Sequence, residues 1–507
     1  MKTKMNKNEI YIMLGILGFI MIICMNFLQM HYSSDTYVLY NLGYFKYPSE
    51  YFLKDGRLIS TLFCYLGGIL HLPIPAYIIA MDFIGMVFLT ISIYIISKIF
   101  IDIIKPENKK KELLTYIASF VLILNQYTLE YLLFPESAVM CLGILFTVLA
   151  IKSFVSDQKY KYLKVSMFLL LTGLCYQGEL NIFPVLAILV VMLKQIKEKK
   201  DTKRFLKDSF KELIKIVLIT IIVLAVSFVI VKICGNIFGQ DKQSFMIINN
   251  ARVLRRKINL VIYYSKDILI NSISMFPKYS ILICPILTLV LLILTKAKIQ
   301  TIVNYIIIVM VAIISVVFPL FVVTAAVCAR LNIPAMMIFG ISLLFLITNL
   351  KNDERKYKEK IISIVVISVF VLNASFIVIN STEHIAANKV DENDGMQIKY
   401  KIEQYEKETG IQVTKFGYSY DVEPQQFAVG IKPMQSLTER KLACSWCILY
   451  AMDYYCERNF ELVDFDTSIL MEENYKENMY HKGNQDYKAF STEQVKFKND
   501  AVYMVVY

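Results

Sequence analysis

Long uninterrupted runs of apolar residues are the feature that most constrains this 507-residue chain. They recur in blocks of about 17–25 residues, the length that an α-helix needs to cross the hydrocarbon core of a bilayer. The composition agrees, because 56% of the residues are hydrophobic and only 19% are charged, against about 45–50% and about 25% in soluble proteins. The sequence therefore predicts an α-helical multi-pass membrane protein and excludes an ordinary soluble enzyme.

Eleven membrane spans are expected. The first apolar run, 9–30, follows Lys2, Lys4 and Lys7, is too long for the core of a signal peptide and lacks a small-residue cleavage site, so it predicts an uncleaved span. Ten more are expected at 76–100, 114–133, 137–153, 163–178, 180–193, 213–238, 276–295, 301–324, 331–350 and 361–380. The aromatic stretch 37–45 and the short run 58–71 are instead expected to be helices on the membrane surface.

The lysine clusters set the orientation of these spans. They fall on every second loop, at 105–111, 152–164, 194–215, 296–298 and 351–360. Cytoplasmic loops carry such an excess of basic residues, so the N-terminus is expected in the cytoplasm and the residues after the eleventh span outside it. The net charge of +12 is explained by these loops and needs no nucleic acid. The expected location is the plasma membrane.

The last part of the chain, 381–507, returns to a soluble composition, with 21 acidic and 14 basic residues. Ile398–Lys407 reads as a helix, and Ile411–Ser419 and Ala501–Tyr507 read as strands. We expect a membrane domain at 1–380 and a small extracytoplasmic α/β domain at 381–507. Three of the ten cysteines lie in this part, at 444, 447 and 456; their spacing leaves open a disulfide, a zinc site or neither.

Ionisable side chains are costly inside a membrane, so their positions are informative. Under the expected topology most of the unusual ones meet at the outer face: Asp35, Asp55, Arg57, Glu136, Gln177, Glu179, Arg252, Arg255, Arg256 and Arg330. Carboxylates can accept a proton from an attacking hydroxyl, and arginines can hold a departing phosphate. Each residue also has a structural interpretation, as a helix cap, a turn residue or a headgroup contact. Asp82 lies inside the second span without an evident partner.

In the order and placement of these residues the chain resembles a known family. Ser34-Asp35-Thr36-Tyr37, Asp55-Gly56-Arg57, Phe134-Pro135-Glu136-Ser137, Tyr176-Gln177 and Ala329-Arg330 resemble the GT-C superfamily of polyprenyl-phosphate-dependent glycosyltransferases, and within it the bacterial type II Gtr glucosyltransferases. The segments 405–410 and 495–507 also fit that family.

The resemblance implies an inverting transfer of a hexose, most simply glucose, from undecaprenyl phosphate to a cell-surface glycan. Asp35 would be the general base, with Asp55 and Glu136 as further catalytic carboxylates. Substrate binding would fall to Arg57, Tyr37, Gln177, Glu179, Arg330 and the group Arg252, Arg255 and Arg256. Many GT-C enzymes have two adjacent acidic residues where this chain has Ser34 and Asp35, so a divalent cation, Mg²⁺ or Mn²⁺, stays open as a cofactor.

Three alternative functions compete with this one. A lipid-linked sugar flippase or transporter would place its polar residues near the middle of the membrane, often within inverted repeats. A polysaccharide polymerase also has many spans and arginine-rich outer loops. A membrane anchor for an adhesive tail would not need eleven spans. The gathering of carboxylates and arginines at one face favours the glycosyltransferase.

Overall fold

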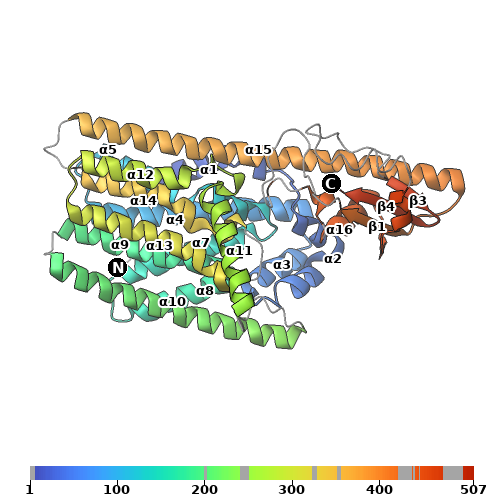
Figure 1. The fold of residues 1–507 in the computed structure, drawn as a ribbon, viewed down its shortest axis with the longest axis horizontal. Coiled ribbons are helices and arrows are strands. Elements are labelled where there is room, and N and C mark those ends of the chain that lie inside the picture. The colour runs from blue at the N-terminus through green and yellow to red at the C-terminus, as the bar shows by residue number, and fades with distance from the viewer. Residues whose placement is uncertain are drawn as a thin grey trace.

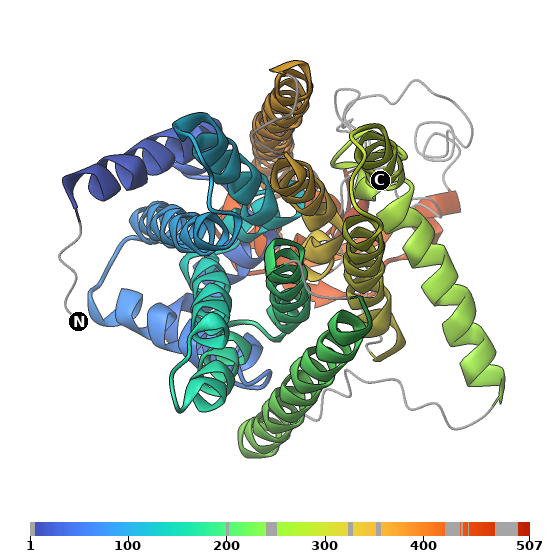
Figure 2. The same ribbon diagram turned by 90° about the vertical axis from the view of Figure 1, so that its left-hand side faces the viewer.

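The computed structural model describes residues 6–198, 202–239, 251–322, 328–350, 356–420, 437, 440–444, 446–471 and 495–506. The molecule is elongated, with a bundle of helices at one end and a small sheet at the other (Figure 1). Most helices run along the long axis, and Figure 2 looks down the bundle from the end remote from the sheet.

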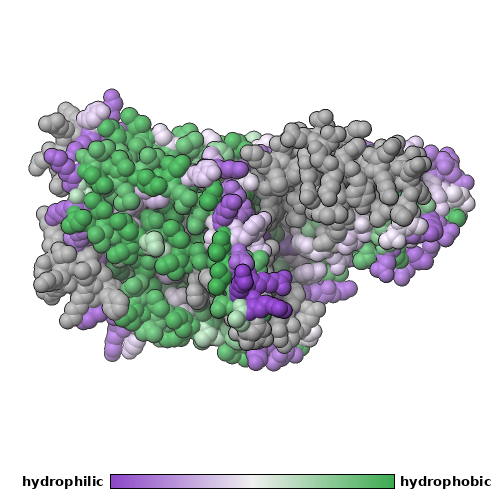
Figure 3. Space-filling view, in the orientation of Figure 1, coloured by the Kyte–Doolittle hydropathy of each residue, from purple (hydrophilic) through white to green (hydrophobic). Residues whose placement is uncertain are grey.

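A helix lies on each of the eleven segments expected to span the membrane. These helices are α1 (Lys7–Ile23), α4 (Ile74–Ile104), α5 (Lys109–Ile123), α7 (Ser137–Val155), α8 (Lys161–Cys175), α9 (Ile182–Glu198), α10 (Thr202–Phe238), α12 (Ser280–Leu294), α13 (Ile299–Val322), α14 (Ile333–Asn349) and α15 (Lys356–Thr409). Six helical segments in the described part of the chain are long and apolar enough to cross a membrane. The space-filling view shows the broad apolar belt that they form (Figure 3).

The expected span at 114–133 ends earlier than predicted. Its helix, α5, stops at Ile123 because Leu124 is extended and Asn125 starts a new short helix, α6 (Gln126–Leu129). The Asn125 side chain accepts hydrogen bonds from the backbone N–H groups of Tyr127 and Thr128, which is how asparagine caps a helix. A 3-10 turn over Glu130–Leu133 follows. Glu130 therefore lies in a fully buried connection beyond the helix.

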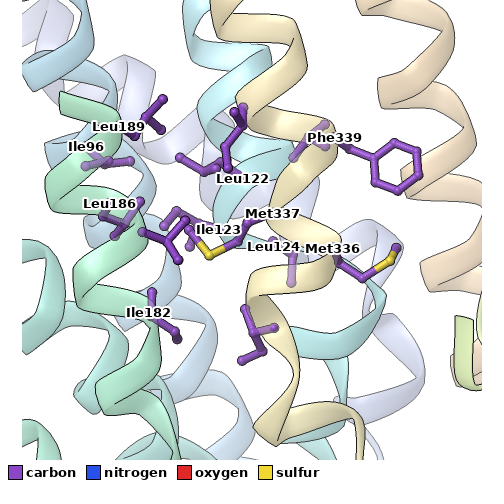
Figure 4. Close-up of a cluster of buried hydrophobic side chains, with 14 of the residues drawn as sticks. Ile96, Leu122, Ile123, Leu124, Ile182, Leu186, Leu189, Met336, Met337 and Phe339 are labelled. Atoms are coloured by element: carbon purple, nitrogen blue, oxygen red, sulfur yellow. The ribbon is translucent and has the colours of Figure 1, made fainter. Parts of the chain in front are cut away.

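The core of the bundle is packed around α14, α5 and α9. Figure 4 shows Ile123 of α5 beside Met337 of α14, with Leu186 of α9 next to them, whereas Met336 points to the opposite side of α14. Every one of these side chains is buried. Gly340 lets the two helices approach, because a Cβ there would lie 2.6 Å from Cα of Leu122.

The end of the bundle nearest the sheet carries three helices that are not spans. They are α2 (Ser34–Tyr51), α3 (Leu58–Ile69) and α11 (Ala251–Leu269). The helix α2 bends at Gly43, whose φ of 73° favours glycine. With only 12 residues, α3 is too short to cross a bilayer. Figure 1 shows α11 running across the axis of the bundle.

The C-terminal part forms a four-stranded sheet in the order β2-β1-β4-β3. Its elements are β1 (Lys415–Tyr420), α16 (Ile448–Cys456), β2 (Glu461–Val463), β3 (Val495–Lys498) and β4 (Ala501–Val506). β1 runs parallel to β2 and β4, and β3 pairs with β4 in an antiparallel hairpin. α15 passes through the expected boundary at 380 without a break and connects this part to the bundle. The expected helix and strands at 398–407, 411–419 and 501–507 correspond to the end of α15, to β1 and to β4.

Hydrogen bonds and ion pairs show which loops share an end of the bundle. At the end remote from the sheet, Lys110 lies 3.2 Å from Glu359, and the Lys111 ammonium donates to the Leu350 carbonyl at 2.8 Å. At the other end, the Gln177 amide donates to the Asp55 carbonyl at 2.7 Å. Lys110 and Lys111 of the first lysine cluster thus lie beside Leu350 and Glu359 at the far end, as the alternation of the loops predicts.

Candidate active site

Asp35 lies in the first turn of α2, at the end of the bundle that faces the sheet. Ser33 caps this helix: its hydroxyl accepts from the Thr36 N–H at 3.2 Å, and its own N–H donates to the Thr36 hydroxyl at 3.0 Å. Asp35 is half-buried. Burial raises the pKa of its carboxyl, against the positive charges of Arg330, Arg57 and Lys441, and the Tyr47 hydroxyl is a further neighbour that lowers it.

Arg57 and Glu136 form a loose ion pair beside Asp35. A turn through Asp55 and Gly56, whose φ is 70°, brings Arg57 to the start of α3. The Arg57 Nη atoms lie 3.8 Å from Glu136 Oε1 and 3.9 Å from Asp55 Oδ2, beyond hydrogen-bonding distance. Its Nε and Glu136 Oε2 are buried and have no hydrogen-bond partner among the described residues. Polar atoms left this way at a charged site indicate a place where a ligand or water binds.

Glu136 precedes α7 and is buried. Burial, followed by the negative charge of Asp35, raises the pKa of its carboxyl to about 8, although Arg57 acts in the opposite direction. A carboxyl with a pKa of about 8 is mostly protonated at neutral pH, so we assign a proton to Glu136. Asp35 has the larger share of cationic neighbours, because Arg330, Arg57 and Lys441 all act on it.

Arg330 is held far more tightly than Arg57. Its Nη1 lies 2.7 Å from Glu130 Oε1, its backbone N–H donates to Glu130 Oε2 at 2.7 Å, and its Nε donates to the Tyr176 hydroxyl at 3.1 Å. The guanidinium also lies over the Phe134 ring, 4.3 Å from its centroid. The Arg57 guanidinium lies 4.8 Å from the centre of the Tyr176 ring. Tyr176 therefore connects the two arginines.

The structure thus brings together most of the site residues expected from the sequence. Asp35, Asp55, Arg57, Glu136, Gln177 and Arg330 belong to this one group, which we call the Asp35 cluster. Four residues next to the cluster were not predicted: Glu130, Tyr47, Tyr176 and Lys441. Tyr176 contacts both arginines, and Lys441 comes from the C-terminal part. Glu130 carried a detectable signal, since it is an ionisable residue within a predicted span.

Other expected residues lie elsewhere. Tyr37 is fully buried in the core of the C-terminal part, where its hydroxyl pairs with that of Tyr455. Glu179 is fully buried against Gly143, two helical turns along α7 from Glu136. Within the described part of the chain, neither side chain makes a hydrogen bond to a member of the Asp35 cluster. Their predicted role in substrate binding stays a prediction.

The three arginines of α11 form a separate surface. Arg252, Arg255 and Arg256 line an open groove of about 560 Å³ together with Asn259, Leu260 and Tyr263. The groove lies on a helix that crosses the end of the bundle (Figure 1). Within the described ranges no contact joins these arginines to the Asp35 cluster, so their role in phosphate binding stays a prediction.

The described residues do not offer a ready metal site. Among them, no group of three or more His, Cys, Asp or Glu side chains is arranged to hold a metal ion. One or two carboxylates together with a substrate phosphate can also hold Mg²⁺, so the divalent cation stays open, and no step below is assigned to one. All ten cysteines have free thiols, Cys444, Cys447 and Cys456 included.

Comparison with known families agrees with the resemblance seen in the sequence. The model of the family described as glucosyl transferase GtrII matches residues 24–345, more than half of the chain. This range contains every member of the Asp35 cluster, whereas the neighbouring Lys441 lies outside it. A search of curated proteins found no match.

Proposed function

Because the chain belongs to the GtrII glucosyl transferase family, we propose that it is an integral membrane glucosyltransferase that uses a polyprenyl-phosphate donor. It transfers glucose from undecaprenyl phosphate to a cell-surface glycan on the outer face of the bacterial plasma membrane. The observation that carries this proposal is the Asp35 cluster. It combines a candidate base with cationic groups at the end of an apolar bundle, where a lipid phosphate would lie.

The chemistry assigned to the cluster is a single displacement. The acceptor hydroxyl oxygen attacks the anomeric carbon of glucose and loses its proton to Asp35. The bond from that carbon to the phosphate oxygen breaks, and the polyprenyl phosphate leaves with the electron pair. One displacement inverts the anomeric centre. A general base of this kind typically contributes about 10²–10⁴-fold to the rate.

Arg57 is the group best suited to hold the phosphate. Its ion pairs, at 3.8 and 3.9 Å, are loose, and its buried Nε has no partner. A phosphate could therefore replace these contacts with shorter, charge-assisted hydrogen bonds. Glu136, protonated at neutral pH, can donate a hydrogen bond to a phosphate oxygen. Arg330 is already bound by Glu130 and Tyr176, so it contributes positive charge and fixes Tyr176.

The topology proposed for this enzyme has eleven spans, a cytoplasmic N-terminus and an extracytoplasmic C-terminal domain. The positions of the lysine-rich loops support it, since Lys110 and Lys111 lie beside Leu350 and Glu359 at the end remote from the sheet. The helices α2 and α3 would then lie at the outer surface of the membrane, and the polyprenyl chain would reach the site from the lipid.

The C-terminal domain is proposed to select the acceptor. It contacts α2 and the segment just before it through tyrosines: the Tyr32 hydroxyl lies 2.7 Å from that of Tyr454, and the Tyr40 ring of α2 lies 4.8 Å from the Tyr454 ring. Trp446, the only tryptophan of the chain, is exposed just before α16. Exposed aromatic rings can stack on the apolar faces of sugars. Lys441 of this domain also acts electrostatically on Asp35.

The test is a transfer assay on the purified protein in lipid nanodiscs. Polyprenyl phosphate carrying radiolabelled glucose is supplied with crude bacterial surface glycan, and label in the glycan is measured. We expect transfer by the wild type. In proteoliposomes, movement of the intact lipid-linked sugar across the bilayer without transfer would contradict the proposal and favour a flippase. Formation of long chains from lipid-linked oligosaccharide would favour a polymerase.

A further inference from the structure

A chain of three buried side chains lies next to the segment that leads into Asp35. His31 Nε2 is 2.9 Å from Asp82 Oδ2, and His31 Nδ1 is 3.2 Å from His384 Nε2. His384 Nδ1 in turn is 2.6 Å from the Leu437 carbonyl. The three side chains come from the segment before α2, from α4 and from α15, and they are 0–1% exposed. His31 is thus the partner of Asp82, for which the sequence showed no evident one.

The carbonyl at the end of this chain fixes the hydrogens along it. A carbonyl only accepts, so His384 Nδ1 must carry a hydrogen and donate it to Leu437. In a neutral imidazole, His384 Nε2 is then an acceptor, and His31 Nδ1 must donate to it. One further proton lies between His31 Nε2 and Asp82. Whichever of the two holds it, all four ring nitrogens take part in a hydrogen bond. The donors between His31 and Leu437 therefore all point toward the Leu437 carbonyl, and the opposite arrangement of hydrogens is not possible.

The residues after His31 are held just as closely. The Tyr32 N–H donates to Asn388 Oδ1 at 2.7 Å, and Asn388 Nδ2 donates to the Tyr32 carbonyl at 2.9 Å. Asn388 lies one turn after His384 on the same face of α15. Ser33 then caps α2. Three consecutive residues, 31–33, are therefore fixed by hydrogen bonds immediately before the helical turn that carries Asp35.

We propose that His31, Asp82 and His384, together with Asn388, are positioning residues for the Asp35 carboxylate. This inference rests on the proposed function, because it assumes that Asp35 is the group to be positioned. None of the four touches the substrate. They anchor the segment 31–33 to α4 and α15, two long helices, and so set the place of the first turn of α2. Displacing a catalytic group by about 1 Å can cost about 10²-fold in rate.

The test compares two substitutions of similar size at one position. Asp82→Asn can donate its amide hydrogen to His31 Nε2 and so preserves the chain, whereas Asp82→Leu leaves that nitrogen buried without a partner. We expect kcat of glucosyl transfer to stay within about threefold of the wild type for D82N and to fall at least about tenfold for D82L. The KM for the donor should stay unchanged in both. Thr90→Val is the matched control on α4, because the buried Thr90 hydroxyl bonds only to the Met86 carbonyl of its own helix.

Equal activity of D82L and the wild type would overturn the proposal, and so would an equal loss in D82N and D82L. If D82L does not fold, Asn388→Ala takes its place. This change removes the two bonds to Tyr32 and should lower kcat several-fold without changing the donor KM. An unchanged kcat in N388A would contradict the proposal.

A second readout does not depend on activity. The chain has only four histidines, so His71→Asn and His481→Gln leave the two of interest. In ¹⁵N-histidine NMR spectra we expect His384 to carry its hydrogen on Nδ1, the tautomer that is less common in water. A His384 side chain with its hydrogen on Nε2 would contradict the proposed series of hydrogen bonds. If the tautomer is as expected but no glucosyl transfer is found, the hydrogen-bonded chain stands and the proposed function fails.

Discussion

The pair formed by Arg330 and Glu130 allows a quantitative prediction. The Glu130 side chain is only 2% exposed, and both its oxygens are bound by Arg330, at 2.7 Å each. In Arg330→Gln this carboxylate loses its counter-ion while it stays buried. Breaking a buried pair from one side costs about 3–5 kcal/mol. We expect about 3 kcal/mol, the lower end, because the bond from the backbone N–H of residue 330 survives and the Arg330 side chain is 23% exposed.

Removing the other partner should be less harmful. Glu130→Gln leaves a guanidinium that still has Tyr176, the Phe134 ring and some access to water, so we expect a loss of about 1–2 kcal/mol. The double variant R330Q/E130Q leaves neither a buried carboxylate nor a guanidinium without its counter-ion. Its loss of stability should be smaller than the sum of the single losses by about 2 kcal/mol.

The assay is unfolding of the purified protein in mixed micelles with increasing SDS, followed by far-UV circular dichroism. Lys46→Gln is the control, because the pair Lys46–Glu50 lies on the surface of α2 at 3.8 Å, and such exposed pairs contribute about 0–1 kcal/mol. If R330Q costs no more than K46Q, or if E130Q does not reduce the effect of R330Q, the reasoning about the buried pair is wrong.

Three further predictions concern pH, packing and capping. Burial and the charge of Asp35 raise the pKa of Glu136 from 4.5 to about 8, so between these pH values the folded protein binds a proton that the unfolded chain releases. The stability of the wild type relative to Glu136→Gln should therefore fall as the pH rises through this range. Thermal unfolding of both proteins at about pH 5, 7 and 9 measures this. Equal pH profiles would contradict this assignment. Gly340→Ala forces α14 away from Leu122 of α5 and should cost about 3 kcal/mol in SDS unfolding, whereas Gly15→Ala, with nothing within 4 Å of the added carbon, should cost nothing. Ser33→Ala removes the cap of α2 and should cost about 1 kcal/mol; the same assay would refute this if no loss is seen.

The arrangement of helices was largely predictable from the sequence because it depends on local properties. An apolar run long enough to cross a bilayer forms a helix wherever it occurs. Lysine clusters on alternate loops then indicate which loops lie at the same end of the bundle. The alternation alone then placed Asp35, Arg57, Glu136 and Arg330 at one end. Their grouping in the structure follows from that placement and from the loops that carry them.

The pairing within the site was not predictable in the same way. Asp82 and His384 are about 300 positions apart, and nothing near either residue indicates that His31 joins them. The ionisable Glu130 stood out within a predicted span, but its partner Arg330 is 200 positions away, and the helix break at Asn125 has no clear signal in the apolar run. Tyr37 was interpreted as an interfacial residue, but its partner is Tyr455 of the C-terminal part. These contacts depend on tertiary packing between distant segments.

The central claim is that Asp35 is the base in glucosyl transfer, and the kinetics of Asp35→Asn test it most directly. The measurement is kcat and donor KM for the wild type, D35N and Glu50→Gln, which removes an exposed carboxylate from the same helix. We predict that D35N lowers kcat by at least about 10²-fold while the donor KM changes little, and that E50Q behaves like the wild type. A folded D35N protein that transfers glucose at the wild-type rate would contradict the account.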